Sequence, residues 1–471
     1  MNNFNTPDLP EKKNQVFVNR TLNMSSIKLI GFDMDYTLIR YNVPEFEALA
    51  YEIMKQKMIK EYDYPEAIAD FQFDKDFIIR GLAIDTESGD FLKINRYGFV
   101  RTASHGTKFY SYEEQREKFG NGSIDLSDSR YYIIHTLFSQ AFGCLYAQLV
   151  DYFDEHNMRH LYKTAFADLH KCLNDAHQET ELKGNVTQYP ERYIYKSPAI
   201  AETLTKFKRF GKKIALITNS DYIYTDKVMK YSIEPFIKGK WQSLFDLVVT
   251  SSEKPGFFTG SARYLRVDEE TGLLSNFYGA IEWGGIYQGG NAAILEKHLQ
   301  LKPSEIIYFG DHIVGDVVTL KETIGWRTAL VVQELAEEVP ILSATAHLRK
   351  QISEKMQQKE DLEERSLVCR EAIWCNPRDP NSKPRQDLEK IKEEIAALDN
   401  EIRDLLSESQ KDFNKYWGEV MRAGNEVSRF ATLVERYACI YMSSVEDLAE
   451  YSPFKYFRSQ RRFLPHDPVQ Y

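Results

Sequence analysis

The chain has 471 residues, 43% of them hydrophobic, so it is long enough for two or three domains with well-packed cores. Its formal net charge of −10 argues against a nucleic-acid-binding protein, because such proteins carry an excess of Lys and Arg. No apolar run approaches membrane-spanning length, and the polar N-terminus lacks a secretory signal. Five scattered cysteines without metal-ligand spacing favour reduced thiols, so we expect a cytoplasmic protein without membrane or nucleic-acid partners.

The N-terminal part of the chain predicts an edge strand followed by a buried strand that ends in two acids. Residues 16–24 have the composition of an edge strand, and residues 27–32 form an apolar run typical of a parallel strand. Asp33 and Asp35 follow, and on an extended strand they would share one face. Two carboxylates this close repel unless a cation compensates them, which favours a functional site over a solvated turn.

A long segment, residues 43–192, separates this strand from the next one. At its start, residues 45–55 have helical periodicity. Hairpins with glycines in their turns are expected at residues 80–99. From Tyr131 to about His170 the sequence predicts an aromatic-rich helix. An insertion of roughly 150 residues at a catalytic edge is long enough to form a cap that shields a reaction from water, so we expect a cap domain here.

Three later apolar strands also end in polar side chains. They are residues 213–217 before Thr218, Asn219 and Ser220, residues 245–250 before Lys254, and residues 306–310 before Asp311 and Asp316. Doubly wound sheets bind ligands at the carboxyl ends of their strands. We therefore predict an α/β fold, a Rossmann-like doubly wound parallel sheet built from residues 1–42 and 193–343. Residues 327–332 would add a further parallel strand, and residues 256–290 are expected to be irregular or a hairpin.

The pattern of apolar and charged residues changes from residue 344 onward. In residues 344–412 apolar side chains recur every three or four positions between charges, on both sides of a Pro- and Asn-rich loop, which predicts an antiparallel helical hairpin. Its charges favour a solvated face or an oligomer contact, so the sequence permits a homo-oligomer. Residues 413–471 are rich in aromatic side chains and are expected to pack back onto the core.

In chain order, the polar motifs resemble those of the haloacid dehalogenase superfamily of phosphotransferases. Phosphoryl transfer needs an in-line nucleophile, a proton donor for the leaving oxygen and neutralisation of charge. Asp33 suits the nucleophile, which would form an aspartyl-phosphate, and Asp35 suits the general acid and base. Mg²⁺ prefers oxygen ligands, which the Asp33 and Asp311 carboxylates and the Asp35 backbone carbonyl would supply.

The remaining motif residues suit supporting roles in the same chemistry. The Thr218 hydroxyl and the amides that follow it, at Asn219 and Ser220, can hold phosphate oxygens. Lys254 would offset the charge of the phosphate and the nucleophile. Asp316 would hold Asp311 or Lys254 in place.

Longer stretches resemble one branch of this superfamily, the cytosolic purine 5′-nucleotidases. The stretches that carry the resemblance are residues 16–21, 31–38, 80–82, 136–138, 218–227, 310–316 and 325–328. The resemblance extends over residues 16–465 and implies a haloacid dehalogenase-like core. It also implies Mg²⁺-dependent hydrolysis of 6-oxopurine nucleoside 5′-monophosphates such as IMP and GMP, and transfer of the phosphoryl group to nucleosides.

The same resemblance implies a base-binding site. Phe138 matches the aromatic residue that stacks on the base, and His177 matches the imidazole on its other side. Lys183 and Asn219 match positions that contact phosphate and sugar. His170 and Asn174 stand where the family carries Arg and Asp toward the base edge, which weakens a claim to strict guanine or hypoxanthine choice.

Two alternatives remain open at this point. The altered base-edge positions favour a phosphatase of the same superfamily that acts on sugar phosphates or modified nucleotides. A non-catalytic nucleotide-binding scaffold would keep the fold, but it would not need to retain all of the acidic, Thr and Lys motif residues.

Overall fold

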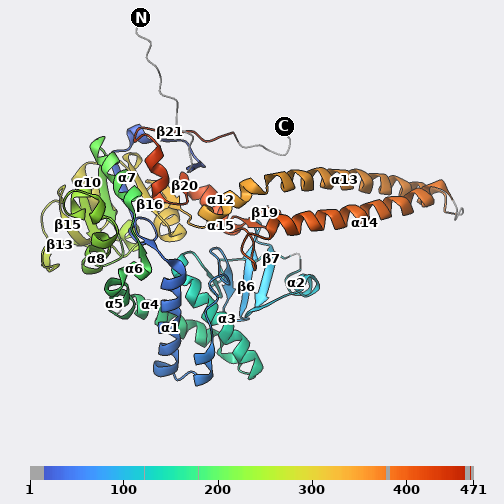
Figure 1. The fold of residues 1–471 in the computed structure, drawn as a ribbon, viewed down its shortest axis with the longest axis horizontal. Coiled ribbons are helices and arrows are strands. Elements are labelled where there is room, and N and C mark those ends of the chain that lie inside the picture. Colours follow the sequence, from blue (N-terminus) through green and yellow to red (C-terminus); the bar gives the residue numbers. More distant parts are fainter. Residues whose placement is uncertain (1–14, 121, 179, 378–381, 462–466, 468–471) are drawn as a thin grey trace, which may run out of the picture. The chain divides into compact units, whose positions relative to one another are not determined.

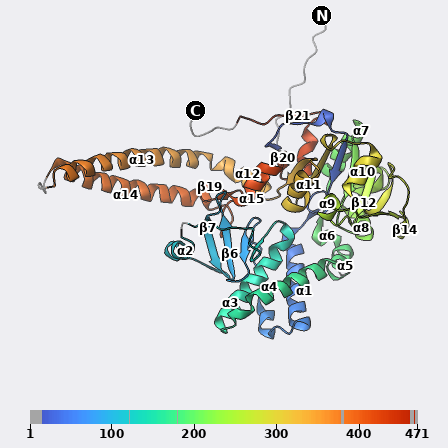
Figure 2. The same cartoon turned by 180° about the vertical axis from the view of Figure 1, so that it is seen from behind.

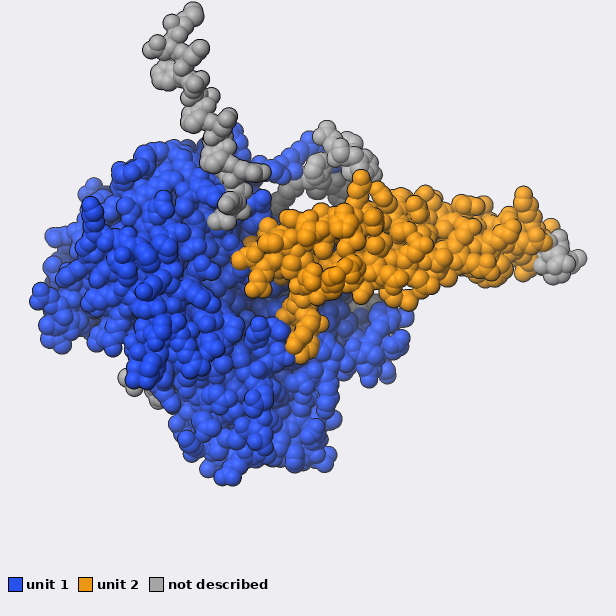
Figure 3. All heavy atoms as spheres, viewed as in Figure 1, with its two compact units in different colours: residues 1–334, 420–471 blue, residues 335–419 orange. Residues whose placement is uncertain are grey.

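The computed structural model describes residues 15–120, 122–178, 180–377, 382–461 and 467. It divides into two compact units, residues 1–334 with 420–471 and residues 335–419, which Figure 3 shows in blue and orange. No helix among these described residues is long and apolar enough to cross a lipid bilayer.

A ten-stranded sheet forms the core of the first unit (Figure 1). Its strands, in spatial order, are β1 (Phe17–Val18), β20 (Ile440–Met442), β17 (Arg327–Val331), β16 (Ile306–Gly310), β3 (Leu29–Phe32), β11 (Lys213–Ile217), β12 (Leu247–Thr250), β15 (Ile286–Gly289), β13 (Tyr264–Val267) and β14 (Leu274–Asn276). Neighbours from β20 to β15 are parallel, whereas β1, β13 and β14 add antiparallel edges. The predicted doubly wound parallel sheet is confirmed.

Helices complete the crossovers between the parallel strands. Those flanking the sheet are α7 (Pro198–Arg209), α8 (Tyr222–Ser232), α9 (Gly256–Thr259), α10 (Ala292–Leu299), α11 (Thr319–Thr323) and α15 (Arg429–Tyr437). The central strand β3 is buried along its whole length, which explains its continuous apolar sequence. Leu29, Ile217 and Val249 pack with Tyr308 and Trp326 in one buried cluster on the sheet.

Two parts of this sheet differ from the sequence-based expectation. Residues 256–290 contain the expected hairpin, β13–β14, but also β15, which extends the parallel sheet beside β12. Strand β15 escaped prediction because it is only four residues long and half of it is incompletely buried. The C-terminal segment supplies β20, which inserts between β17 and the edge strand β1.

The segment between β3 and β11 builds its own sheet and helices, which Figure 2 shows from behind. The strands are β8 (Lys108–Phe109), β7 (Val100–His105), β6 (Asp90–Ile94), β5 (Ala83–Asp85) and β9 (Tyr131–Ile133), and the main helices are α1 (Val43–Glu61), α2 (Tyr112–Phe119), α3 (Gln140–Glu155), α4 (Tyr162–Gln178) and α5 (Thr180–Gln188). The helical structure expected over residues 131–170 is present in α3 and α4, but the prediction is wrong for β9. That stretch is a strand followed by two helices, because the chain turns after α3 at Asn157, whose φ is +58°.

The second unit contains α12 (Leu335–Ala344), α13 (Ala346–Cys375) and α14 (Lys383–Gln410). Lys355 pairs with Glu401 and Lys359 pairs with Asp399 at 2.6 Å, so α13 and α14 run antiparallel. Leu362, Ile391 and Ile402 are buried along this helix pair.

A buried acid in α1 has a consequence for stability. Glu47 is fully buried, and its Oε2 accepts a hydrogen bond from the backbone N–H of Ala141 at 2.8 Å. Burial raises the pKa of Glu47 from 4.5 to about 8, although that hydrogen bond lowers it. Between pH 4.5 and about pH 8, Glu47 is therefore protonated in the folded chain and ionised in the unfolded chain. Stability therefore falls as the pH rises through this window, by about 1.4 kcal/mol per pH unit from this group.

We expect Glu47→Gln to remove this pH dependence, because the amide keeps an acceptor for Ala141 and cannot ionise. Urea unfolding across that pH range should give a flatter free energy of unfolding for the variant and a higher value at the alkaline end. Glu61→Gln, a half-exposed position on the same helix, is the control. Parallel pH curves for Glu47→Gln and the unmodified protein would contradict the assignment.

Candidate active site

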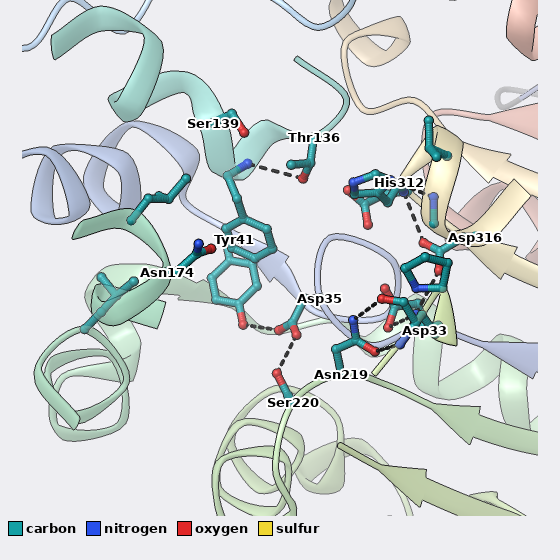
Figure 4. A pocket seen from close by; sticks show the side chains of 18 of the residues that line it. Asp33, Asp35, Tyr41, Thr136, Ser139, Asn174, Asn219, Ser220, His312 and Asp316 are labelled. Carbon is teal, nitrogen blue, oxygen red and sulfur yellow. Dashed lines mark hydrogen bonds and ion pairs between the residues drawn. The ribbon is translucent and has the colours of Figure 1, made fainter. Parts of the chain in front are cut away.

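The carboxyl ends of four neighbouring strands, β16, β3, β11 and β12, border a cavity of about 520 Å³ (Figure 4). Of the predicted site residues, those that line it are Asp33, Asp35, Phe138, His170, Asn174, Lys183, Asn219, Ser220, Lys254, Asp311 and Asp316. Thr218 lies at the same edge but is fully buried, and its hydroxyl accepts a hydrogen bond from the N–H of Ser220 at 3.1 Å. His177 belongs to α4, and its side chain lies outside the described residues.

Asp33 and Asp35 follow β3, as expected, but they do not continue its extended conformation, so the shared strand face considered from the sequence does not apply. Strand β3 ends at Phe32, and the chain then turns so that the N–H groups of Leu38 and Ile39 both donate to the carbonyl of Met34 at 2.8 Å. The two carboxylates are therefore presented by a turn, not by the alternation of an extended strand.

A buried lysine lies between two carboxylates. The Nζ atom of Lys254 is 2.8 Å from Asp33 Oδ1 and 2.8 Å from Asp316 Oδ1, and it donates to the Tyr308 hydroxyl at 2.8 Å. The two acids raise the pKa of Lys254 well above its usual value despite burial, so the amine stays charged. Burial raises the pKa of Asp33 to about 6, against the opposing effect of Lys254.

Asn219 holds the loop that carries Lys254. Its Oδ1 accepts hydrogen bonds from the Lys254 N–H at 2.6 Å and the Ser252 hydroxyl at 2.9 Å, and its Nδ2 donates to the Lys254 carbonyl at 3.0 Å. The Lys254–Pro255 peptide is cis. Asn219 thus positions the lysine, a role that its sequence match to a substrate contact did not indicate.

The acids of this edge suit a divalent cation. Carboxylate oxygens of Asp33, Asp311 and Asp316 lie within 4.8 Å of one another. Asp311 Oδ2 is buried and has no hydrogen-bond partner within the described part of the chain, and burial raises the pKa of Asp311 well above its usual value. A hard ion such as Mg²⁺ binds oxygen ligands of this kind. The structure therefore has both an unsatisfied buried ligand and a suitable donor set.

Asp316 contributes to this edge in another way. One of its oxygens pairs with Lys254, and the other accepts the N–H of His312 at 3.1 Å. Both oxygens are thus already engaged, which leaves Asp33 and Asp311 to face an ion. Gly310 is required here, because a Cβ at that position would collide with the Asp316 side chain.

Asp35 is fixed by two hydroxyl donors. The Tyr41 hydroxyl donates to Oδ1 at 2.5 Å and the Ser220 hydroxyl donates to Oδ2 at 2.7 Å, as Figure 4 shows. The Tyr224 hydroxyl lies 2.8 Å from that of Tyr41. Burial, with a smaller contribution from Asp33, raises the pKa of Asp35 to about 6. A carboxyl group with such a pKa can donate or accept a proton near neutral pH.

Aromatic and polar side chains form the wall of the cavity contributed by residues 43–192. Phe138 packs edge-on against Tyr36, with ring centroids 4.4 Å apart, and is tilted against Phe46 at 5.5 Å. The His170 Nδ1 and the Asn174 Nδ2 are 3.2 Å apart. This end of the cavity therefore combines an apolar ring with neutral polar groups.

Lys183 lies at the same cavity but already has an acidic partner. Its Nζ is 2.8 Å from Asp221 Oδ2 and 5.2 Å from the centre of the Tyr224 ring. Asp221 caps α8, since its other oxygen accepts the Tyr224 N–H at 2.9 Å. The predicted contact between Lys183 and phosphate stays a prediction.

Three tyrosines of this site, Tyr41, Tyr224 and Tyr308, were not predicted from the sequence. One signal for Tyr308 was present, because glycine inside a strand marks a close approach. A Cβ on Gly31 would lie 2.8 Å from the Tyr308 ring. The Tyr308 side chain crosses β3, and its hydroxyl donates a hydrogen bond to the Ile217 carbonyl at 2.7 Å. Tyr41 and Tyr224 carry no such signal.

Comparison with known proteins gives one family. The model described as the 5′ nucleotidase family matches residues 16–469. A 5′-nucleotidase domain-containing protein of Dictyostelium discoideum is 28% identical over 461 residues, which cover 96% of this chain and 74% of that protein. The 5′-nucleotidase domain-containing protein 2 of Rattus norvegicus is 28% identical over 479 residues, which cover 96% of this chain and 80% of that protein.

The similarity to two solved structures is much lower. CbbY from Rhodobacter sphaeroides in complex with phosphate is 12% identical with a TM-score of 0.26, covering 65% of this chain and 86% of CbbY. The HAD-hydrolase YfnB from Bacillus subtilis bound to magnesium is 13% identical with a TM-score of 0.22, covering 65% of this chain and 88% of YfnB. The fold assignment accordingly rests on the strand order and register described above.

Proposed function

Because the chain belongs to the 5′ nucleotidase family, and is thus a phosphoric monoester hydrolase, we propose that it is a Mg²⁺-dependent enzyme for purine nucleoside 5′-monophosphates of the IMP and GMP type. The observation that carries this proposal is the convergence of Asp33, Lys254, Asp311 and Asp316 at one edge of the sheet. A nucleophile, a fixed positive charge and a place for a divalent ion are what phosphoryl transfer requires.

The proposed reaction uses two carboxyl groups in turn. Asp33 attacks phosphorus and forms an aspartyl-phosphate, while protonated Asp35 gives its proton to the departing 5′ oxygen of the nucleoside. Ionised Asp35 then accepts a proton from the water that attacks the aspartyl-phosphate, releasing phosphate and restoring both groups. A nucleoside hydroxyl in place of that water would give phosphotransfer. When bound by Asp33, Asp311 and the Asp35 carbonyl, Mg²⁺ would neutralise charge on the phosphoryl oxygens.

The cavity suits a nucleotide because its two ends differ. Its volume of about 520 Å³ falls in the range of small-molecule sites. The acids and Lys254 lie at the end formed by the sheet, and Phe138 lies at the end contributed by residues 43–192. We propose that this segment is the cap and binds the base, and that residues 1–42 and 193–343 form the catalytic core, on which residues 413–471 pack.

We expect Phe138→Ala to weaken hydrolysis of purine nucleotides without affecting ribose 5-phosphate. Stacking on an aromatic ring is worth about 1–3 kcal/mol per base, which corresponds to a loss of roughly 5- to 150-fold in kcat/KM. The measurement is steady-state kinetics on both substrates. Phe109→Ala removes a partly exposed ring of the same segment outside the cavity and is the control. An equal loss on both substrates would argue against base stacking.

A second candidate activity, hydrolysis of sugar phosphates or modified nucleotides, is favoured by the neutral pair His170 and Asn174. A panel of nucleoside and sugar monophosphates assayed with Mg²⁺ separates the alternatives. Release of phosphate from purine nucleotides supports the main proposal, and release from non-nucleotides alone supports the second. Binding of nucleotides without any turnover would indicate a scaffold and refute both enzymatic proposals.

A further inference from the structure

Arg80 is the most deeply buried cation near the site, and it does not line the cavity. It is 1% exposed, and its guanidinium forms a two-point ion pair with Glu334, in which Nε donates to Oε1 at 2.7 Å. Its Nη1 donates to the backbone carbonyl of Asp311 at 3.0 Å and also approaches that of Val331 at 3.5 Å. A charge taken out of water is tolerated only with partners of this kind, so the fold supplies them for Arg80.

These partners belong to two adjacent strands of the catalytic edge. Asp311 directly follows β16, and Val331 is the last residue of β17, which pairs with β16 in parallel register. Glu334 lies three residues beyond the end of β17. The Arg80 side chain, which comes from the inserted segment, therefore connects the carboxyl ends of both strands next to Asp311.

The backbone around Arg80 is tied to the substrate wall of the cavity. The N–H of Gly81 donates to the Ile134 carbonyl at 2.8 Å, and the N–H of Ile134 donates to the Leu82 carbonyl at 2.9 Å. From Ile134 the chain runs on through Thr136 to Phe138. Arg80 thus connects the segment that carries the aromatic wall with the strand end that carries Asp311.

Packing also fixes the position of this arginine. Gly81 has a φ of +88°, and a Cβ there would lie 2.6 Å from the Cβ of Phe430. The guanidinium carbon of Arg80 lies 5.3 Å from the centre of the Phe430 ring. A lysine would lose the two-point pairing with Glu334, because its ammonium group is a single point charge.

We propose that Arg80 is a positioning residue for the divalent cation site. It acts through the backbone of Asp311, holding that carboxylate toward Asp33 while fixing residues 80–82 and 134–138 against the same edge. It touches neither substrate nor reacting atoms. This inference rests on the proposed function, since it assumes that Asp33 and Asp311 hold a divalent ion.

The test measures metal affinity without turnover. Mn²⁺, which takes the same oxygen ligands as Mg²⁺, is titrated into the full chain and followed by electron paramagnetic resonance. The variants are Arg80→Lys and the double variant Arg80→Met with Glu334→Gln, which leaves no buried unpaired charge. Arg96→Met is the matched control, because Arg96 forms a more exposed pair with Glu435 at 3.7 Å in the same unit.

We expect both Arg80 variants to raise the Mn²⁺ Kd by roughly 10- to 100-fold, as residues that orient metal ligands do, while Arg96→Met leaves it unchanged. In kinetics, the Mg²⁺ concentration for half-maximal activity should rise more than kcat falls. A folded Arg80 variant with the parental Kd would overturn the role of Arg80 alone. Failure of the unmodified protein to bind Mn²⁺ would instead overturn the metal site and the proposed function with it.

Discussion

Replacing Asp33 by Asn is expected to lower kcat for purine nucleotide hydrolysis by roughly 10⁶-fold, the scale of loss seen when a covalent nucleophile is removed. The amide oxygen of Asn does not form the acyl phosphate. Asn has nearly the same size as Asp, and it can keep the hydrogen bond from the Met34 N–H, which is 2.8 Å in the native chain. The charge of Lys254 loses one of its two acidic partners but retains Asp316. The variant should therefore fold and lose chemistry specifically.

Two measurements check this expectation. Phosphate release reports the loss in kcat, and acid quenching of the unmodified enzyme with nucleotide labelled at phosphorus should trap label on a peptide that contains Asp33. Asp128→Asn, which changes a half-exposed acid in the inserted segment, is the control and should leave both readouts unchanged. A folded Asp33→Asn enzyme with more than a small fraction of parental activity, or label on another peptide, would exclude Asp33 as the nucleophile.

The convergence of the motif residues could be predicted from the sequence because parallel strands end at one edge. Strands β3, β11 and β16 are continuous apolar runs, and each is followed at once by polar side chains. Their adjacency to one another and to β12, which precedes Lys254, then brings Asp33, Lys254 and Asp311 together. The strand end at Phe32 was also predicted, but periodicity could not show that a turn presents both acids. Tyr36 has a φ of +55°, and such a turn interrupts the alternation that placed both acids on one strand face.

Other parts of the site depend on tertiary proximity and leave no local pattern. Tyr41 and Tyr224 are far apart in the chain, and each has the sequence surroundings of an ordinary buried aromatic residue. Only the packed fold shows that their hydroxyl groups form a chain leading to Asp35. Strand β20 is similar, since its three residues join the sheet only because the C-terminal segment returns between β1 and β17.

Arg80 illustrates a third case, in which the sequence marks a residue without revealing its role. The stretch at residues 80–82 contributed to the family resemblance, yet nothing near it suggests catalysis. The structure explains the arginine through partners more than 200 positions away, at Asp311 and Glu334. A contact of that sequence separation cannot be derived from local periodicity or propensity.

Asp35→Asn is expected to lower kcat for purine nucleotides by roughly 10²- to 10⁴-fold, the usual contribution of a general acid and base. The 5′ oxygen of a nucleoside leaves as a poorly stabilised alkoxide, so its departure depends on the proton from Asp35. The hydroxyl groups of Tyr41 and Ser220 both donate to Asp35 in the native chain. An Asn side chain has one oxygen to accept them, and one hydroxyl must turn away.

An aryl phosphate separates the two roles of Asp35. Its phenolate leaves without a proton donor, so formation of the aspartyl-phosphate should stay fast in Asp35→Asn, whereas attack by water still lacks its base. We therefore expect a rapid burst of phenolate, close to one equivalent of enzyme, followed by slow turnover. With the nucleotide no burst of nucleoside should appear, because the first step is itself slow. An equal loss in the first step for both substrates would contradict the assignment, since a group that only shapes the cavity would not distinguish leaving groups.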